Sequence, residues 1–109
     1  MVRSMMFAGA AILVLGSSAV AQDAVAKGQQ VFADQKCSVC HSIAGKGNSK
    51  GPLDKVGSKL TAAEIRQWIT DAKAMTEKTK ATRTPAMKQF SLPADEVDAL
   101  VAYLSTLKK

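Results

Sequence analysis

The pentapeptide Cys37-Ser38-Val39-Cys40-His41 decides how this sequence folds. Two thiols within about one helical turn have the spacing needed to bond both vinyl groups of a haem, and the adjacent histidine then lies beneath the iron. The chain has no other cysteine and no other histidine. The motif therefore predicts one covalently attached haem c per chain, held by Cys37 and Cys40, with His41 as an iron ligand.

Other uses of two closely spaced cysteines fit the sequence less well. A thioredoxin-like dithiol needs a βαβ context, which the sequence does not indicate. A structural zinc site needs four ligands, and only two cysteines and one histidine are present. A disulfide between Cys37 and Cys40 is left open as an alternative, although it would close almost no loop and stabilise little.

The first 21 residues have the composition of a secretory signal peptide. Arg3 precedes an apolar run, and Ala19-Val20-Ala21 has the small residues of a cleavage site. We expect cleavage after Ala21, export to the periplasm or another exported compartment, and a single small domain over residues 22–109. The alternative is a retained membrane anchor, because the run from Met5 to Ala21 is at the lower limit for crossing a bilayer.

The mature domain is small and poor in aromatic side chains, so its fold is only marginally stable without an additional link or cofactor. A large apolar cofactor would complete its core. Its aromatic residues are Phe32, Trp68, Phe90 and Tyr103. The whole chain has 15 Lys and Arg against 9 Asp and Glu, a net charge of +6. This charge suits acidic protein partners. No nucleic-acid-binding motif is present, so we expect no nucleic-acid partner.

The periodicity of apolar residues predicts an all-α domain of about three helices. They cover about 23–34, about 61–72 and a final segment beginning near Pro93. In the first, Val25, Gln29 and Phe32 are spaced to share a face, and Gly28 indicates close packing. Thr61 and Glu64 form a capping box at the start of the second. The connections 42–59 and 75–91 are expected to be loops that wrap around the cofactor.

A single histidine excludes bis-histidine ligation within one chain, so the sixth iron ligand is Met, Lys, an amine, an external molecule or nothing. Met75 and Met87 are the two methionines outside the leader. Met75 lies at the predicted end of the second helix and is readily explained as core. Met87 lies in the second long loop, shortly after Pro85, and we expect it to be the ligand.

With these residues assembled, the chain resembles the small class I cytochromes c over nearly all of residues 23–109. Gly28 and Phe32 match the first helix of that family, Leu100 and Tyr103 match its last helix, and the Gly-Pro-x-Leu segment is matched at 51–53. The resemblance implies that the Pro52 carbonyl accepts a hydrogen bond from His41. It also implies that Trp68 faces a haem propionate, with a simple core position as the alternative. The connection 75–91, which contains Met87 and is called the methionine loop below, departs from the family, because a proline here precedes Met87 and Lys88 follows it.

These features together predict a soluble, monomeric electron carrier that is not an enzyme and has no small-molecule substrate. With the leader removed, no stable membrane insertion is expected. Basic residues around the second loop would attract acidic redox partners; they are Lys73, Lys78, Lys80, Arg83 and Lys88. Two alternatives stay open. An iron with an open sixth position would suit a sensor of small ligands or a peroxidase-like protein, and a fixed subunit of a larger oxidoreductase would also transfer electrons.

Overall fold

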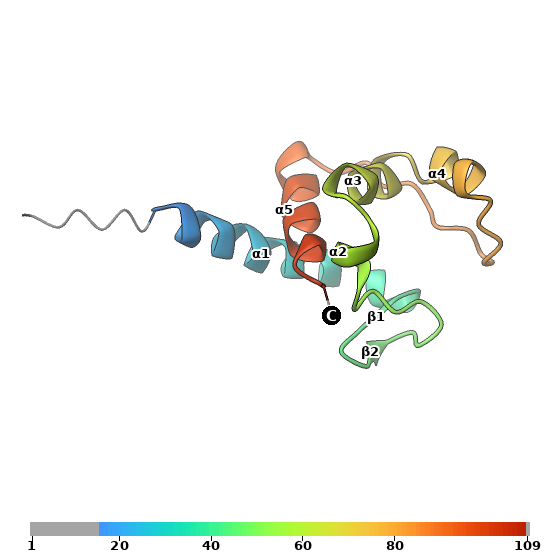
Figure 1. The fold of residues 1–109 in the computed structure, drawn as a ribbon, viewed down its shortest axis with the longest axis horizontal. Coiled ribbons are helices and arrows are strands. Elements are labelled where there is room, and N and C mark those ends of the chain that lie inside the picture. Colours follow the sequence, from blue (N-terminus) through green and yellow to red (C-terminus); the bar gives the residue numbers. More distant parts are fainter. Residues whose placement is uncertain (1–15, 109) are drawn as a thin grey trace, which may run out of the picture.

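The computed structural model describes residues 16–108, so most of the predicted leader lies outside the described residues. Five α-helices, one 3-10 helix and a two-stranded antiparallel sheet follow one another in this part of the chain (Figure 1). In order they are α1 (Gly16–Asp34), η1 (Cys37–Val39), β1 (Ser42–Ile43), β2 (Lys46–Gly47), α2 (Val56–Lys59), α3 (Ala62–Thr70), α4 (Ala72–Thr79) and α5 (Ala94–Ser105). The fold is mostly helical, which confirms the predicted all-α class.

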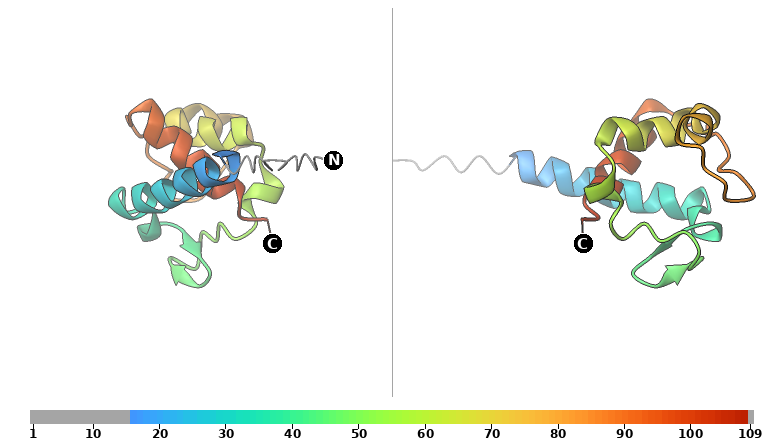
Figure 2. Two further views of the ribbon diagram at one scale, coloured as in Figure 1. Left: turned by 90° about the vertical axis from the view of Figure 1, so that its left-hand side faces the viewer. Right: turned by 45° about the vertical axis from the view of Figure 1, so that its right-hand side comes forward.

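The first and last helices cross and form the centre of the fold, as Figures 1 and 2 show. Gly28 lies at the crossing, where a Cβ atom would overlap the Ala99 carbonyl oxygen and come within 2.6 Å of the Tyr103 Cβ. The close packing predicted from this glycine is therefore confirmed. Phe32 meets Tyr103 edge to face, with ring centroids 6.0 Å apart and an interplanar angle of 84°.

The helix α3 covers α5 with one apolar face and begins where the sequence predicts. Thr61 and Glu64 form the expected capping box, since the Thr61 side chain accepts from the Glu64 amide and the Glu64 carboxylate accepts from the Thr61 amide. Ile65 and Ile69 are buried against the core that α1 and α5 share. An ion pair between Arg66 and Asp98, 2.7 Å long, joins the outer edges of α3 and α5.

The segment that contains α2 closes the domain against the end of α5. The Gly57 amide donates to the Leu107 carbonyl at 2.7 Å, and the Ser58 hydroxyl donates to the Lys108 carbonyl at 2.7 Å. A Cβ atom on Gly57 would overlap the Ser105 carbonyl, so this approach requires glycine. These contacts fix one end of the long connection from β2 to α3.

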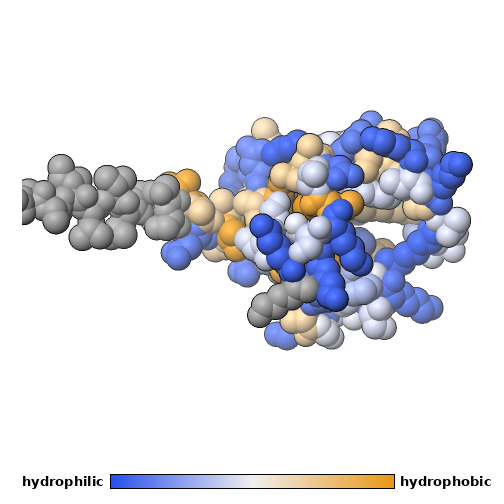
Figure 3. Space-filling model, in the orientation of Figure 1, coloured by the Kyte–Doolittle hydropathy of each residue, from blue (hydrophilic) through white to orange (hydrophobic). Residues whose placement is uncertain are grey.

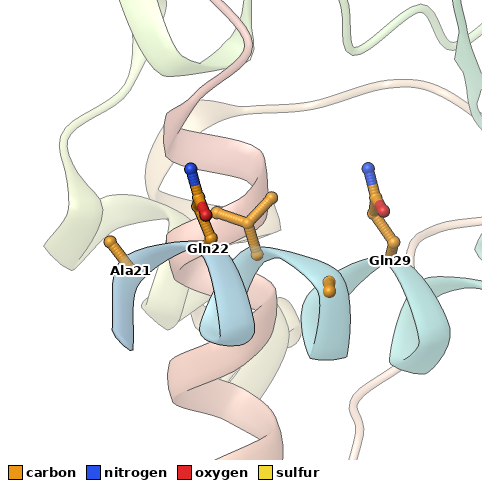
Figure 4. Close-up of a pocket in the computed structure, with 5 residues that line it drawn as sticks. Ala21, Gln22 and Gln29 are labelled. Carbon is orange, nitrogen blue, oxygen red and sulfur yellow. The ribbon is translucent and has the colours of Figure 1, made fainter. Parts of the chain in front are cut away.

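Two helix expectations need correction. The packing face of α1 is centred on buried Gly28 and Val31, whereas Gln29 is exposed and lines a shallow surface pocket with Val25 and Gln22 (Figure 4). The chain between 72 and 79 is also not a loop but the separate helix α4. Among the described residues, no helix is both long and apolar enough to cross a membrane.

Candidate haem site

The two cysteines and the histidine of the motif lie on one tight turn. Lys36 adopts a left-handed conformation (φ 56°) directly after α1, and η1 begins at the next residue. The amides of Cys40 and His41 both donate to the Cys37 carbonyl, at 3.2 and 2.9 Å. Both cysteines are free thiols, Cys37 half-buried and Cys40 exposed. The turn therefore presents two thiols and an imidazole in the close succession that covalent haem attachment requires.

The His41 ring is oriented by a backbone carbonyl. Its Nδ1 lies 3.1 Å from the Gly51 oxygen, which also accepts from the Ser42 amide at 3.0 Å. The resemblance implied that the Pro52 carbonyl accepts this hydrogen bond, but the acceptor in the structure is the Gly51 carbonyl. The bridge between Ser42 and Pro52 turns the Gly51 carbonyl toward the ring. With Nδ1 donating, Nε2 keeps the lone pair that binds a metal.

Burial favours the neutral forms of the two half-buried groups of the turn. Burial raises the pKa of the Cys37 thiol, and this outweighs the nearby charge of Lys88. Burial also lowers the pKa of His41, against the opposing effect of its bond to Gly51, and the charge of Arg83 lowers it further. At neutral pH the imidazole is therefore uncharged, which is the form that ligates metals.

Asn48 braces the turn from outside and was missed by the sequence analysis. Its side-chain amide donates to the Val39 carbonyl at 3.1 Å, and its main-chain amide lies 3.1 Å from both the Ser38 and His41 carbonyls. Its own carbonyl accepts from the Gly51 amide at 3.1 Å. One residue thus connects the thiol-bearing turn to the peptide that orients His41. A signal was present, because Gly47-Asn48 is a dipeptide typical of turns.

The methionine loop crosses toward this turn from the far side of the fold. Two backbone hydrogen bonds hold its ends. The Ala81 amide donates to the Thr76 carbonyl at 3.1 Å, and the Phe90 amide donates to the Ile69 carbonyl at 3.2 Å. Met87 is half-buried within it, whereas Met75 is 1% exposed in α4 and belongs to the core. The charges on both sides of Met87 reach the motif, since Arg83 acts on His41 and Lys88 acts on Cys37.

The space between the motif and the methionine loop suits a large apolar group. Figure 3 shows the molecule hollowed between the upper part, with α3 and α4, and the lower part, with β1 and β2. Apolar side chains from several elements are only partly buried beside the core, including Ile43, Leu53, Val56, Leu60, Phe90 and Leu92. Trp68 is also half-buried, on α3. A haem would cover apolar surface that the chain alone leaves exposed to water.

The comparisons with known proteins bear directly on this arrangement of donors. The family described as cytochrome c matches residues 25–108, which include the motif, the methionine loop and α5. The chain belongs to the cytochrome c family. Membership means that it carries covalently bound haem c and that its role is electron transfer with redox protein partners.

One curated protein that the chain is similar to is a subunit of an oxidase. Cytochrome c oxidase subunit 2 of Alkalihalophilus pseudofirmus is 28% identical over 91 residues, which cover 75% of this chain and 25% of that protein. The chain therefore spans about a quarter of the length of the curated relative that it matches. No solved structure gives a significant match.

Proposed function

We propose that this cytochrome c carries single electrons between protein partners, with its haem bonded to Cys37 and Cys40 and its iron between His41 and Met87. The observation that carries the proposal is the turn that presents both thiols beside an imidazole whose Nδ1 is tied to Gly51, 3.1 Å away. A histidine held in this way has its Nε2 aimed by the protein rather than by the metal.

Each residue of the site has a distinct task. The two thiols would hold the haem as thioethers, each S–H adding across a vinyl double bond, so the cofactor would be retained through every redox cycle. The bound haem supplies the one-electron ferric/ferrous couple. Gly51 and Asn48 keep the imidazole and the turn in place, so the protein around the iron would rearrange little when the iron changes between the ferric and ferrous states. The thioether of Met87 is a neutral donor that favours the reduced state relative to a stronger donor.

The remaining specifics also belong to the proposal. We infer that residues 1–21 are a cleaved signal peptide, that residues 22–109 form the mature domain, and that this domain acts in the periplasm or another exported compartment as a monomer. In the proposal Pro52 contributes by bridging to Ser42, and Trp68 faces a propionate. Acidic partners would dock on the basic residues of the methionine loop, where the positive field would speed their approach at low salt.

A fixed position in a larger complex is the second candidate function, because the relative from Alkalihalophilus pseudofirmus is named as an oxidase subunit. A free carrier reacts with its partner at a rate that falls steeply with ionic strength. A fixed subunit instead co-purifies with a larger oxidoreductase at high salt. Gel filtration of the native protein in 0.5 M salt, a concentration chosen at about the level where surface charges are largely screened, separates the two.

The ligand assignment is tested by absorption spectra of the oxidised and reduced protein with two methionine variants. Met87→Leu and Met75→Leu remove the same thioether at similar volume, one from the loop and one from the buried core. We expect the wild type and Met75→Leu to be low-spin with the weak far-red sulfur-to-iron band, and Met87→Leu to lose that band. A high-spin wild type that binds carbon monoxide would instead favour ligand sensing or peroxidase chemistry and would overturn the assignment of Met87.

A further inference from the structure

The guanidinium of Arg83, from the loop that contains Met87, lies beside the peptide that orients His41. Figure 1 shows the segment after α4 descending toward the loop that contains β1 and β2. The guanidinium of Arg83 occupies the place that a side chain would take on Gly51, since a Cβ atom there would overlap its Nη1. The same position lies 3.0 Å from the His41 Nδ1. Glycine at 51 thus makes room for an arginine beside the imidazole.

The charge that Arg83 brings to this position is permanent, because a guanidinium does not lose its proton in proteins. The Arg83 guanidinium lies against the position that a Gly51 Cβ would take, and that position is 3.0 Å from the His41 Nδ1, so a positive charge lies close to the imidazole. A positive charge that opposes added positive charge at His41 also opposes the extra positive charge of a ferric centre bonded to that residue. The ferrous state is favoured by comparison.

Neighbouring basic residues do not share this placement. Lys88 lies over the Phe90 ring, 5.0 Å from its centroid, and its charge acts on Cys37. Lys80 ends α4 in a left-handed conformation and is exposed. Arg83 differs in its place, because its guanidinium lies against Gly51, whose carbonyl oxygen is 3.1 Å from the His41 Nδ1. Among these three basic residues, Arg83 is therefore the one that lies beside the peptide that orients His41.

We propose that Arg83 is a positioning residue that anchors the methionine loop to Gly51 and raises the reduction potential of the haem site. The proposal deepens the electron-carrier function and rests on His41 being an iron ligand. It assigns two consequences to one side chain. The charge sets the balance between the ferric and ferrous states, and the contact holds the loop that contains Met87 against the opposite side of the site.

The test is the midpoint potential of the haem-loaded full chain with three variants. Arg83→Gln and Lys80→Gln each remove one positive charge from the same loop region, but only the first removes it from beside His41. Arg83→Lys keeps the charge. We expect Arg83→Gln to lower the potential by at least twice as much as Lys80→Gln, and Arg83→Lys to stay closer to wild type than to Arg83→Gln. Raising the ionic strength should reduce the difference in midpoint potential between wild type and Arg83→Gln.

Equal shifts for Arg83→Gln and Lys80→Gln would overturn the proposal, because net charge alone would then explain them. Equal losses for Arg83→Gln and Arg83→Lys would also overturn it, since the contact and not the charge would be responsible. Circular dichroism of each variant confirms that the helices are intact. The absorption spectrum reports separately on the iron ligands, so a failed ligand assignment is distinguishable from a failed role for Arg83.

Discussion

At the scale of single residues, the attachment turn depends on a side chain outside the motif. Asn48 makes two side-chain hydrogen bonds, donating to the Val39 carbonyl at 3.1 Å and accepting from the Lys50 amide at 3.0 Å. Without them the carbonyl between the two cysteines has no fixed partner, and the turn can open before the thioethers form. The motif specifies which atoms react, and Asn48 holds them in place.

We expect Asn48→Ala to lower the free energy of unfolding by about 1–2 kcal/mol, the usual net value of two hydrogen bonds. It should also lower the yield of covalently attached haem. Chemical denaturation and the haem absorbance that survives extraction with acidified solvent measure the two effects. Ser49→Ala, at the adjacent exposed position, is the control and should change stability by less than about 0.5 kcal/mol. If Asn48→Ala behaves like Ser49→Ala, the bracing role is wrong.

The motif residues can be read directly from the sequence, but their hydrogen-bond partners cannot. Cys37, Cys40 and His41 are defined by spacing along the chain, which the sequence states directly. The acceptor for His41 is Gly51 and not Pro52, and this depends on how the segment after β2 bridges to Ser42. That pairing joins residues ten apart through a loop without hydrophobic periodicity. The local sequence pattern therefore indicates Cys37, Cys40 and His41, whereas tertiary contacts decide which carbonyl orients the His41 ring.

At the scale of elements, the starts of α3 and α5 were predicted well, whereas α1 includes Gly16 and so begins before the predicted Asp23, and the break between α3 and α4 was missed. The capping box at Thr61 and the helix start after Pro93 rest on local chemistry, and the structure confirms both. The break at Asp71 is a second helix start, where its side chain accepts from the Ala74 amide at 3.4 Å. Asp is a good N-cap residue, but inside an apparently continuous helical pattern that signal is easily overlooked. The strands β1 and β2 have two residues each, too few for any alternation to be visible.

The crossing of α1 and α5 gives a prediction whose sign is opposite to intrinsic helix propensity. Alanine normally favours a helix over glycine by about 1 kcal/mol. At Gly28 the added methyl would overlap the Ala99 carbonyl, so the helices must separate. We expect Gly28→Ala to lower the thermal stability of the haem-loaded protein, with an overpacking cost of about 1–3 kcal/mol. Gln29→Ala, at the next and exposed position of α1, should leave stability unchanged or raise it slightly, and a stabilised Gly28→Ala would contradict the packing.

The same two helices are joined by an ion pair between Lys27 and Asp95. The pair lowers the pKa of Asp95 below 3.8 and raises the pKa of Lys27 above 10.5, chiefly through the hydrogen bond between the two side chains. A carboxylate with a lowered pKa stabilises the fold at pH values above 3.8 and loses this effect as pH falls through its folded value. A lysine with a raised pKa stabilises it below 10.5 and loses this effect as pH rises further.

Asp95→Asn should therefore melt at a lower temperature than wild type at pH 7, and the difference should shrink toward zero as the pH falls through the lowered pKa of Asp95 in the folded protein. Thermal melts at three pH values measure this. Asp23→Asn removes the same charge from α1 without affecting the pair and is the control. Because both partners are exposed, 0.1–0.5 M salt should also reduce the difference, over about the range that screens surface charges. A difference that persists at low pH would show that the ion pair is not its cause.

At the scale of the whole molecule, the core is incomplete without the cofactor. The buried cluster joins α1, α3 and α5, and partly buried apolar side chains from the loops, such as Ile43, Leu53 and Phe90, pack against it. A domain this small buries too little surface to be comfortably stable alone. The family match implies bound haem c, so we expect part of the stability of the fold to depend on the same group that carries the electron.

This dependence predicts what happens when attachment is prevented. The double variant Cys37→Ala/Cys40→Ala should lose covalent haem and, with it, a large share of the roughly 5–15 kcal/mol that stabilises an ordinary domain. The expected result is a weaker and less cooperative thermal transition by circular dichroism. Either single cysteine variant keeps one thioether and should fall between the double variant and wild type, while Ser38→Ala, between the two cysteines, should match wild type. A double variant that melts like wild type would mean that α1, α3 and α5 are sufficient for the fold, and that the half-exposed apolar side chains serve binding alone.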